Sequence, residues 1–118
     1  MAVRHLNVEV RLESEVAVLD LMGEINGFAE EALNTAYQQA HAKDTNTILL
    51  NFEGVDYINS TGIALIVGLL AKARASHKRL LACNLSEHYV EIFNITRLSD
   101  FMGIFPDEQS AISEISVS

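Results

Sequence analysis

The chain has 118 residues, of which 49% are hydrophobic and 20% are charged, and 8 basic against 16 acidic residues give a net charge of −8. This length fits one domain, and the apolar content excludes an intrinsically disordered chain. The acidic balance disfavours nucleic-acid binding, because the chain would repel the phosphate backbone, so we expect protein partners instead.

The sequence also indicates a compartment. Residues 1–15 interleave apolar and charged side chains and lack the apolar core of a signal peptide. The longest apolar stretch, residues 63–71, is interrupted by a glycine and falls far short of the roughly 20 residues that a membrane-spanning helix needs. A single cysteine, Cys83, excludes an intrachain disulfide and suits a reducing compartment. We therefore expect a cytoplasmic protein without membrane insertion.

The N-terminal part of the chain predicts two strands and a helix. Apolar and charged residues alternate over 8–13, and a turn at 14–15 leads into a second strand over 16–22, as in an antiparallel hairpin. Two glycines make residues 23–27 a predicted loop. A helix is expected over 28–42, because apolar residues recur there at helical spacing. These are Ala29, Leu33, Ala36, Tyr37 and Ala40.

The middle of the chain predicts a crossover between two buried strands. Residues 47–52 are almost continuously apolar, as in a central strand that is covered on both faces. A loop over 54–59 and a helix over 60–77 follow, and residues 80–83 form another buried strand. Because a strand, a helix and a strand in succession require a crossover, the two strands should be parallel.

The C-terminal part completes the fold. Ser86 is a good N-cap for a helix through residue 94, and residues 100–105 form a last strand or extended piece. Pro106 opens a C-terminal helix that carries Ala111, Ile112 and Ile115. The sequence therefore predicts one α/β domain, with a mixed sheet of four or five strands and about four helices packed on it.

Ser60 and Thr61 stand at the expected start of the helix over 60–77, as its N-cap and first-turn residues. A helix N-terminus presents unpaired N–H groups and about half a positive charge, so it accepts an anion readily. A phosphate on Ser60 would add about −1.5 to −2 charges at this point. From the residues alone, the pattern is that of a helix cap and nothing more specific.

The same helix presents three faces when it is projected at about 100° per residue. The stripe expected to face the sheet comprises Ile63, Ile66, Val67, Leu70 and Ala73. A second stripe holds only small residues, namely Ser60, Ala64, Gly68, Ala71 and Ala75, and Leu65 and Leu69 lie beyond it. This small-residue stripe either receives a partner's backbone or helix, or packs under the C-terminal helix of the same domain.

Half of the basic residues gather at the end of this helix. Lys72, Arg74, Lys78 and Arg79 lie within residues 57–86, which contain no acidic residue. They complement the helix dipole, and ordinary charge optimisation of a helix explains them equally well.

No catalytic or metal-binding pattern accompanies these features. The four histidines are scattered, and the glycines around the helix lack the Lys-Ser/Thr that follows a phosphate-binding loop. We therefore expect a binding protein with no cofactor, no metal and no enzymatic activity. A small hydrolase that uses Ser60 is the alternative from the enzyme class.

Three segments together resemble the STAS domain family, and most closely its stand-alone anti-sigma factor antagonists. They are Gly23-Glu24-Ile25-Asn26 after a strand, the strand Ile48–Phe52, and the turn Asp56-x-x-Asn59-Ser60-Thr61-Gly62-Ile63 before an apolar helix. The turn is the most specific, since family members typically have Asp-Ser-Ser/Thr-Gly there. The resemblance covers nearly the whole chain and implies one STAS domain over residues 1–118.

By this resemblance, Ser60 is phosphorylated by a serine-kinase anti-sigma factor of the histidine-kinase-like ATPase fold, with Thr61 as the fallback acceptor. The unphosphorylated form binds that kinase and frees a sigma factor, and a phosphoserine phosphatase restores it. The implied partner-binding residues are Gly23, Glu24, Asn26, Asn59, Ser60, Thr61, Gly62, Ala64, Leu65, Gly68 and Leu69. The alternative within the family is a regulatory module that acts on a phosphatase, a cyclase, a biofilm regulator or a transporter.

Two positions depart from the family pattern. Asn59 stands where Asp usually precedes the phosphoacceptor, and Asn26 stands where Asp is common in the Gly-Glu segment. Both asparagines keep the capacity to accept hydrogen bonds but remove a carboxylate. If either charge helps a kinase to orient the serine, phosphorylation here is slower or the partner differs.

Overall fold

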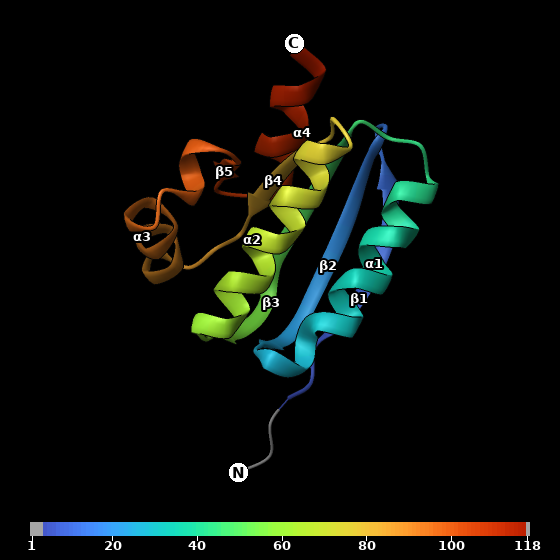
Figure 1. Cartoon of the computed structure of the whole chain (residues 1–118). Helices are drawn as coiled ribbons and strands as arrows, with labels where there is room; N and C mark the ends of the chain where they lie inside the picture. The colour runs from blue at the N-terminus through green and yellow to red at the C-terminus, as the bar shows by residue number, and fades with distance from the viewer. Residues whose placement is uncertain (1–3, 118) are drawn as a thin grey trace.

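The computed structural model describes residues 4–117, except for the side chains of residues 116 and 117, and contains one five-stranded sheet and four helices within them (Figure 1). The strands are β1 (Asn7–Glu13), β2 (Val16–Ile25), β3 (Thr47–Ile58), β4 (Arg79–Cys83) and β5 (Gly103–Phe105). The helices are α1 (Glu30–Ala42), α2 (Ser60–Ala75), α3 (Glu87–Ile95) and α4 (Glu108–Val117), with 3-10 turns at Gly27–Ala29 and Leu98–Asp100. The predicted α/β class is confirmed.

The strands lie in the sheet in the order in which they occur in the chain, β1-β2-β3-β4-β5. β1 and β2 form the predicted antiparallel hairpin, and the other neighbours are parallel. Ser14 and Glu15 connect the hairpin with φ angles of 49° and 68°. Positive φ at both turn residues gives the two-residue turn whose twist matches that of the flanking strands.

β2 and β3 extend further than the sequence indicates, so the loops predicted over 23–27 and 54–59 are wrong in part. β2 continues to Ile25 and β3 to Ile58, and these two residues face each other in the parallel register. The register shifts between Gly23 and Glu24, where Gly23 has a φ of +113°. A glycine that breaks the local pattern therefore marks an irregularity inside a strand rather than the end of that strand.

Alternation along β2 separates two layers of packing. Leu19 and Leu21 pack in the cluster that also holds buried residues of α1, α2 and α3, whereas Val16 and Val18 pack in a second cluster on the opposite face. Figure 1 shows α1 and α2 lying over the near face of the sheet. α4 covers that second face and contributes the buried Ala111. The central strands are thus buried on both faces, as their continuous apolar sequence predicts.

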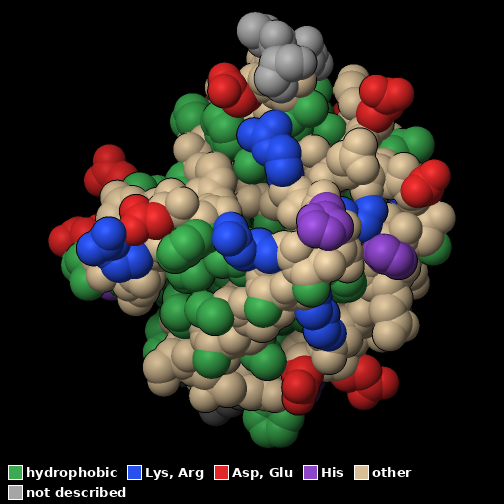
Figure 2. Space-filling model, turned by 45° about the horizontal axis from the view of Figure 1, so that its top comes forward, with side chains coloured by type: hydrophobic (Ala, Val, Ile, Leu, Met, Phe, Trp, Pro, Cys, Tyr) green, Lys and Arg blue, Asp and Glu red, His purple; other side chains and the backbone are tan. Residues whose placement is uncertain are grey.

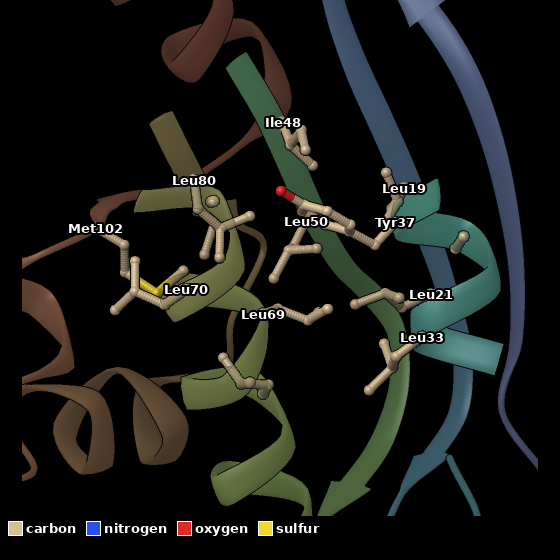
Figure 3. Packing of buried hydrophobic residues seen from close by; sticks show 14 of the residues in the cluster. Leu19, Leu21, Leu33, Tyr37, Ile48, Leu50, Leu69, Leu70, Leu80 and Met102 are labelled. Atoms are coloured by element: carbon tan, nitrogen blue, oxygen red, sulfur yellow. The ribbon is translucent and has the colours of Figure 1, made fainter. Parts of the chain in front are cut away.

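The core under α2 differs from the predicted helix projection. Ile66, Leu69 and Leu70 are buried, and Leu69 points toward Leu21 of the sheet (Figure 3). Val67 is 46% exposed, so its assignment to the core and the placement of Leu69 outside it are both wrong. Because α2 is apolar over most of its circumference, the periodicity alone cannot fix its rotation. Packing beside α1 turns the helix so that Leu69 enters the core.

The C-terminal helix also corrects two expectations. α4 lies across the sheet from α2, so the small-residue stripe of α2 does not pack beneath it. A Cβ added to Gly68 would meet nothing within 4 Å, and this stripe therefore faces outward. α4 begins at Glu108 rather than at Pro106, because the Asp107 side chain accepts a hydrogen bond from the Ser110 N–H at 2.8 Å and caps the helix.

An ion-pair cluster joins α4 to the hairpin. Arg11 of β1 donates to Asp20 at 2.7 Å and to Glu108 of α4 at 3.0 Å, and Asn51 also donates to Asp20 at 2.8 Å. Hydrogen bonding to Arg11 lowers the pKa of the Asp20 carboxyl below its ordinary value. The cluster therefore stabilises the fold at pH values above the ordinary pKa of an aspartate. This stabilisation is lost as the pH falls below that value toward the lowered pKa of Asp20.

The Tyr37 hydroxyl predicts a stabilising substitution. Among the described side chains, the Tyr37 hydroxyl oxygen is the one buried polar atom that has no hydrogen-bond partner. It points toward Ile48 and Leu50 (Figure 3). Because a buried donor without a partner is destabilising, Tyr37→Phe should raise the free energy of unfolding by about 1 kcal/mol in urea titrations. Tyr89→Phe is the matched control and should lower it, because the Tyr89 hydroxyl accepts from the Ile58 N–H at 2.8 Å. Equal effects of the two changes would contradict the prediction.

Cys83 provides a second prediction. Its side chain lies in the cluster beneath α4 with 0% exposure, and burial raises the pKa of the thiol to about 12, with Glu108 and Asp107 adding to the rise. We expect no reaction with a disulfide reagent at pH 8 until urea unfolds the protein. Because the unfolded thiol ionises near 9.0, the free energy of unfolding should also fall as the pH rises from that value toward 12. Rapid labelling of the native protein would contradict this burial.

Candidate functional site

The candidate site lies where β2 and β3 end. Carboxyl ends of neighbouring parallel strands meet at the same edge of a sheet, and here Glu24 faces Tyr57 in the register. The Asn59 N–H donates to the Ile25 carbonyl at 3.2 Å, which ties the two strand ends together. The segments 23–26 and 59–62, far apart in the chain, therefore lie side by side.

Asn59, rather than Ser60 or Thr61, caps α2. Its backbone is extended, its side-chain oxygen accepts from the Gly62 N–H at 2.8 Å, and its carbonyl accepts from the Ile63 N–H at 2.9 Å. Ser60 is the first residue of the helix. The predicted cap is thus wrong by one residue, because asparagine at the preceding position is itself among the most favourable N-caps.

This arrangement leaves Ser60 available for chemistry. The Ser60 and Thr61 side chains are both exposed, and within residues 4–117 the Ser60 hydroxyl makes no hydrogen bond. Both residues occupy the first turn of a 16-residue helix, whose N–H groups have no helical acceptors. An oxyanion attached to Ser60 would therefore meet a favourable local field.

Asn26 performs a second capping function at this edge. Its side-chain oxygen accepts from the Phe28 N–H at 2.9 Å and begins the 3-10 turn over 27–29. A Cβ added to Gly27 would lie 3.7 Å from Thr61 Cγ2, so this turn contacts the start of α2. Each of the two asparagines that depart from the family pattern therefore forms a structural cap. Neither adds the carboxylate that aspartate would bring to this edge.

The charges near the site are mostly acidic. Asp56 forms an ion pair with Arg4 at 2.6 Å, and both side chains are substantially exposed. The Glu24 N–H donates to the Arg4 carbonyl at 2.9 Å, which places the segment before β1 along the end of β2. The Glu24 carboxylate accepts from the Arg4 backbone N–H at 3.4 Å, so the guanidinium of Arg4 is paired with Asp56 and not with Glu24.

The predicted partner-binding residues divide into three groups by exposure. Ser60, Thr61, Ala64 and Gly68 are exposed along one side of α2, and Glu24, Asn26, Asn59 and Leu65 are partly buried. Gly23, Gly62 and Leu69 are buried. Leu69, at 2% exposure, packs in the core, so the expectation that it borders the small-residue stripe is wrong.

The two buried glycines have structural functions at the site. A Cβ added to Gly62 would lie 2.0 Å from the Ile25 carbonyl oxygen, so α2 begins directly against the end of β2. A Cβ on Gly23 would lie 2.6 Å from the His5 carbonyl oxygen, and its φ of +113° also favours glycine. Gly23 and Gly62 therefore allow the close packing that holds the exposed residues of the site in position.

Three exposed apolar residues that the sequence analysis did not assign to the site belong to the same elements. Phe28 is 78% exposed in the turn after Asn26, Tyr57 is 52% exposed at the end of β3, and Val67 is 46% exposed on α2. Single exposed apolar side chains are common on protein surfaces, and it is their position on the elements of the site that relates these three to it. A signal was present for Phe28, since an aromatic residue directly after Asn-Gly lies in a turn and not in a buried stripe.

Other chemistry has little support in the described residues. Within residues 4–117, no group of three or more His, Cys, Asp or Glu side chains is arranged to hold a metal ion. In the same part of the chain, no helix is both long enough and apolar enough to span a membrane.

Comparison with known proteins supports one family. A family model described as the STAS domain matches residues 7–111. An anti-sigma-B factor antagonist of Staphylococcus aureus is 28% identical over 100 residues, which cover 85% of this chain and 93% of that protein.

Solved structures agree with this match. The Bacillus cell fate determinant SpoIIAA in its phosphorylated form is 25% identical with a TM-score of 0.69, and the alignment covers 93% of this chain and 98% of that chain. A sulfate transporter family protein from Wolinella succinogenes has a TM-score of 0.76 at 14% identity, covering 91% of this chain and 89% of that one. At so low an identity, the second likeness concerns the fold alone.

Proposed function

Because the chain belongs to the STAS domain family, we propose that it is an anti-sigma factor antagonist controlled by phosphorylation of Ser60. In this proposal the unphosphorylated protein binds a serine-kinase anti-sigma factor in the cytoplasm and releases a sigma factor. Phosphorylation ends the binding, and a phosphoserine phosphatase reverses it. The protein is a ligand and a substrate rather than a catalyst.

The main support is the position of Ser60. The side chain is exposed on the first residue of α2, and the Asn59 side chain already satisfies the cap. The hydroxyl is therefore free to enter a kinase active site without breaking a structural hydrogen bond. The similarity to SpoIIAA, whose structure is known in a phosphorylated form, agrees with a phosphoacceptor in this family.

The surface around Ser60 also suits a protein partner. Ala64 and Gly68 continue the exposed side of α2 without bulky side chains, so a partner helix or strand can approach the backbone closely. Phe28 and Val67 add exposed apolar area on the same elements. Aromatic side chains such as Phe28 are enriched in the buried centres of protein interfaces.

Phosphorylation by a candidate serine-kinase anti-sigma factor from the same genome tests the proposal. We expect one phosphate per chain after incubation with ATP, mapped to Ser60 by tandem mass spectrometry and lost in Ser60→Ala. Ser86→Ala is the matched control, because Ser86 also lies exposed at a helix start but serves as a cap there. A site away from Ser60 and Thr61 would overturn the switch. Recovery of a transporter or cyclase complex without any kinase would favour the alternative regulatory module.

A further inference from the structure

The eight Lys and Arg side chains fall into two groups. Arg4, Arg11 and Arg97 each form an ion pair with a carboxylate. Within residues 4–117, the other five form none. These five are Lys43, Lys72, Arg74, Lys78 and Arg79.

The five unpaired cations gather at one end of the molecule. They lie in the last part of α2, directly after α1 and at the start of β4, whereas Ser60 begins α2. A helix of 16 residues is about 24 Å long, so this end is well separated from the Ser60 surface. Figure 2 shows Lys, Arg and His side chains over the middle of this end, with most Asp and Glu side chains toward the rim.

Helix dipoles explain only part of this charge. Lys72 and Arg74 lie in the last turns of α2 and complement its carbonyl end, but Lys78 and Arg79 follow the helix. Lys78 donates to the Thr45 carbonyl, a neutral acceptor. Its hydrogen bond fixes the ammonium in place without neutralising the charge.

Three of these cations surround a cavity of about 350 Å³ between the end of α2, β4 and residues 99–103. The cationic lining consists of Arg74, Lys78 and Arg79, and the apolar lining includes the buried Leu70, Leu80 and Met102. The cavity therefore combines an apolar wall with a cationic rim. Asp100 also lines it, but this carboxylate is already paired with Arg97 at 2.6 Å.

An exposed aromatic ring positions one of the cations. The Arg74 guanidinium carbon lies 5.2 Å from the centroid of the Phe101 ring, and Phe101 is 56% exposed. Stacking on a ring orients a guanidinium and leaves its N–H groups free to bind a carboxylate in a bidentate manner.

We propose that this basic pocket, formed by Arg74, Lys78, Arg79 and Phe101, binds an acidic segment of a partner protein. Carboxylates of the segment pair with the cations, and an apolar side chain between them contacts the Leu70 wall. A nucleic acid fits less well, because it presents no apolar side chain and the chain carries 16 acidic residues in all. The pocket is independent of the function proposed for Ser60.

Binding of a fluorescein-labelled acidic peptide, with one leucine flanked by glutamates, tests this proposal by anisotropy. We expect binding that weakens as salt is raised, because the rim is exposed to solvent. The double variant Arg74→Gln/Arg79→Gln should weaken it about tenfold. Lys43→Gln, which removes an unpaired cation that does not line the pocket, is the matched control and should leave affinity unchanged, as should Ser60→Asp. Thermal unfolding followed by circular dichroism checks that each variant folds.

Four outcomes would overturn the proposal. They are equal binding of a peptide with glutamine in place of glutamate, unchanged affinity in the double variant, preference for a single-stranded RNA over the peptide, and self-association at low salt that the double variant abolishes. The last would identify a second copy of this chain as the occupant. Replacement of the peptide leucine by serine should weaken binding as well. Unchanged affinity for the serine peptide would show that the apolar wall does not take part in binding.

Discussion

Replacing Ser60 with aspartate should weaken binding to the anti-sigma factor about 100-fold, which corresponds to about 2.8 kcal/mol, without destabilising the fold. An anion buried at the centre of an interface is unfavourable unless cations meet it. At this edge Glu24 and Asp56 add negative charge, and Arg4 is already paired with Asp56. The unpaired cations lie at the far end of α2.

Stability should respond in the opposite direction to binding. An acidic side chain in the first turn of a helix is stabilising by about 0.3–1 kcal/mol, so the melting temperature of Ser60→Asp should be unchanged or slightly higher. Isothermal titration with the anti-sigma factor measures the first effect and calorimetric unfolding the second. Ser86→Asp is the matched control and should leave binding intact. Wild-type affinity of Ser60→Asp would contradict the switch, whereas loss of stability would mean that Ser60 is a structural residue.

Gly62→Ala should lower the free energy of unfolding by about 3 kcal/mol. The added Cβ would lie 2.0 Å from the Ile25 carbonyl oxygen and 2.8 Å from its carbon, so either α2 or the end of β2 must move. Because both atoms belong to the backbone, no side-chain rotation can relieve the contact. Urea unfolding with linear extrapolation measures the loss.

Gly68→Ala in the same helix is the matched control. Nothing lies within 4 Å of the position of its added Cβ, and alanine in a helix interior is more favourable than glycine by about 1 kcal/mol. This variant should therefore be more stable than the wild type. A similar loss in both variants would contradict the contact with β2 as the cause, because helix propensity alone predicts a gain in each. Gly62→Ala should also weaken partner binding, because it displaces Ser60.

Local patterns predicted much of the fold because they act over short distances. The alternation over 8–13 and the turn at Ser14-Glu15 suffice for the hairpin, and the apolar stripe of α1 is buried as expected. The parallel pairing of β3 with β4 follows from the crossover between them. Each of these features depends on residues that are close in the chain or on a general topological rule.

Features that depend on distant segments could not be predicted in the same way. The strand ends at Ile25 and Ile58 exist because each provides the partner of the other, and neither segment alone shows a strand pattern. Leu69 is buried because α2 packs beside α1, which its own nearly uniform apolar sequence does not reveal. Asn59 rather than Ser60 caps α2, because both residue types can form an N-cap and only the backbone geometry selects one of them.

The candidate site shows the same division. The turn around Ser60 was recognised from residue types, but the apolar residues beside it were not, because exposure depends on how the whole domain packs. Phe28 was expected to begin the first helix, but it lies in the 3-10 turn before α1 and is 78% exposed. Its exposure makes it the first residue to substitute when the partner surface is mapped.

The order β1-β2-β3-β4-β5 has a consequence for how the chain acquires its structure. Every strand pairs with the strand that precedes it, so the sheet can grow from the hairpin outward as the polypeptide leaves the ribosome. No strand has to be inserted between two that are already paired, and after the hairpin each parallel strand joins its neighbour through one helix-containing connection. The edge on which Ser60 depends is complete once β3 has paired with β2 and α2 has followed. In such an order of assembly, the elements of the Ser60 edge are all in place before those of the basic pocket, which also needs β4, Phe101 and β5.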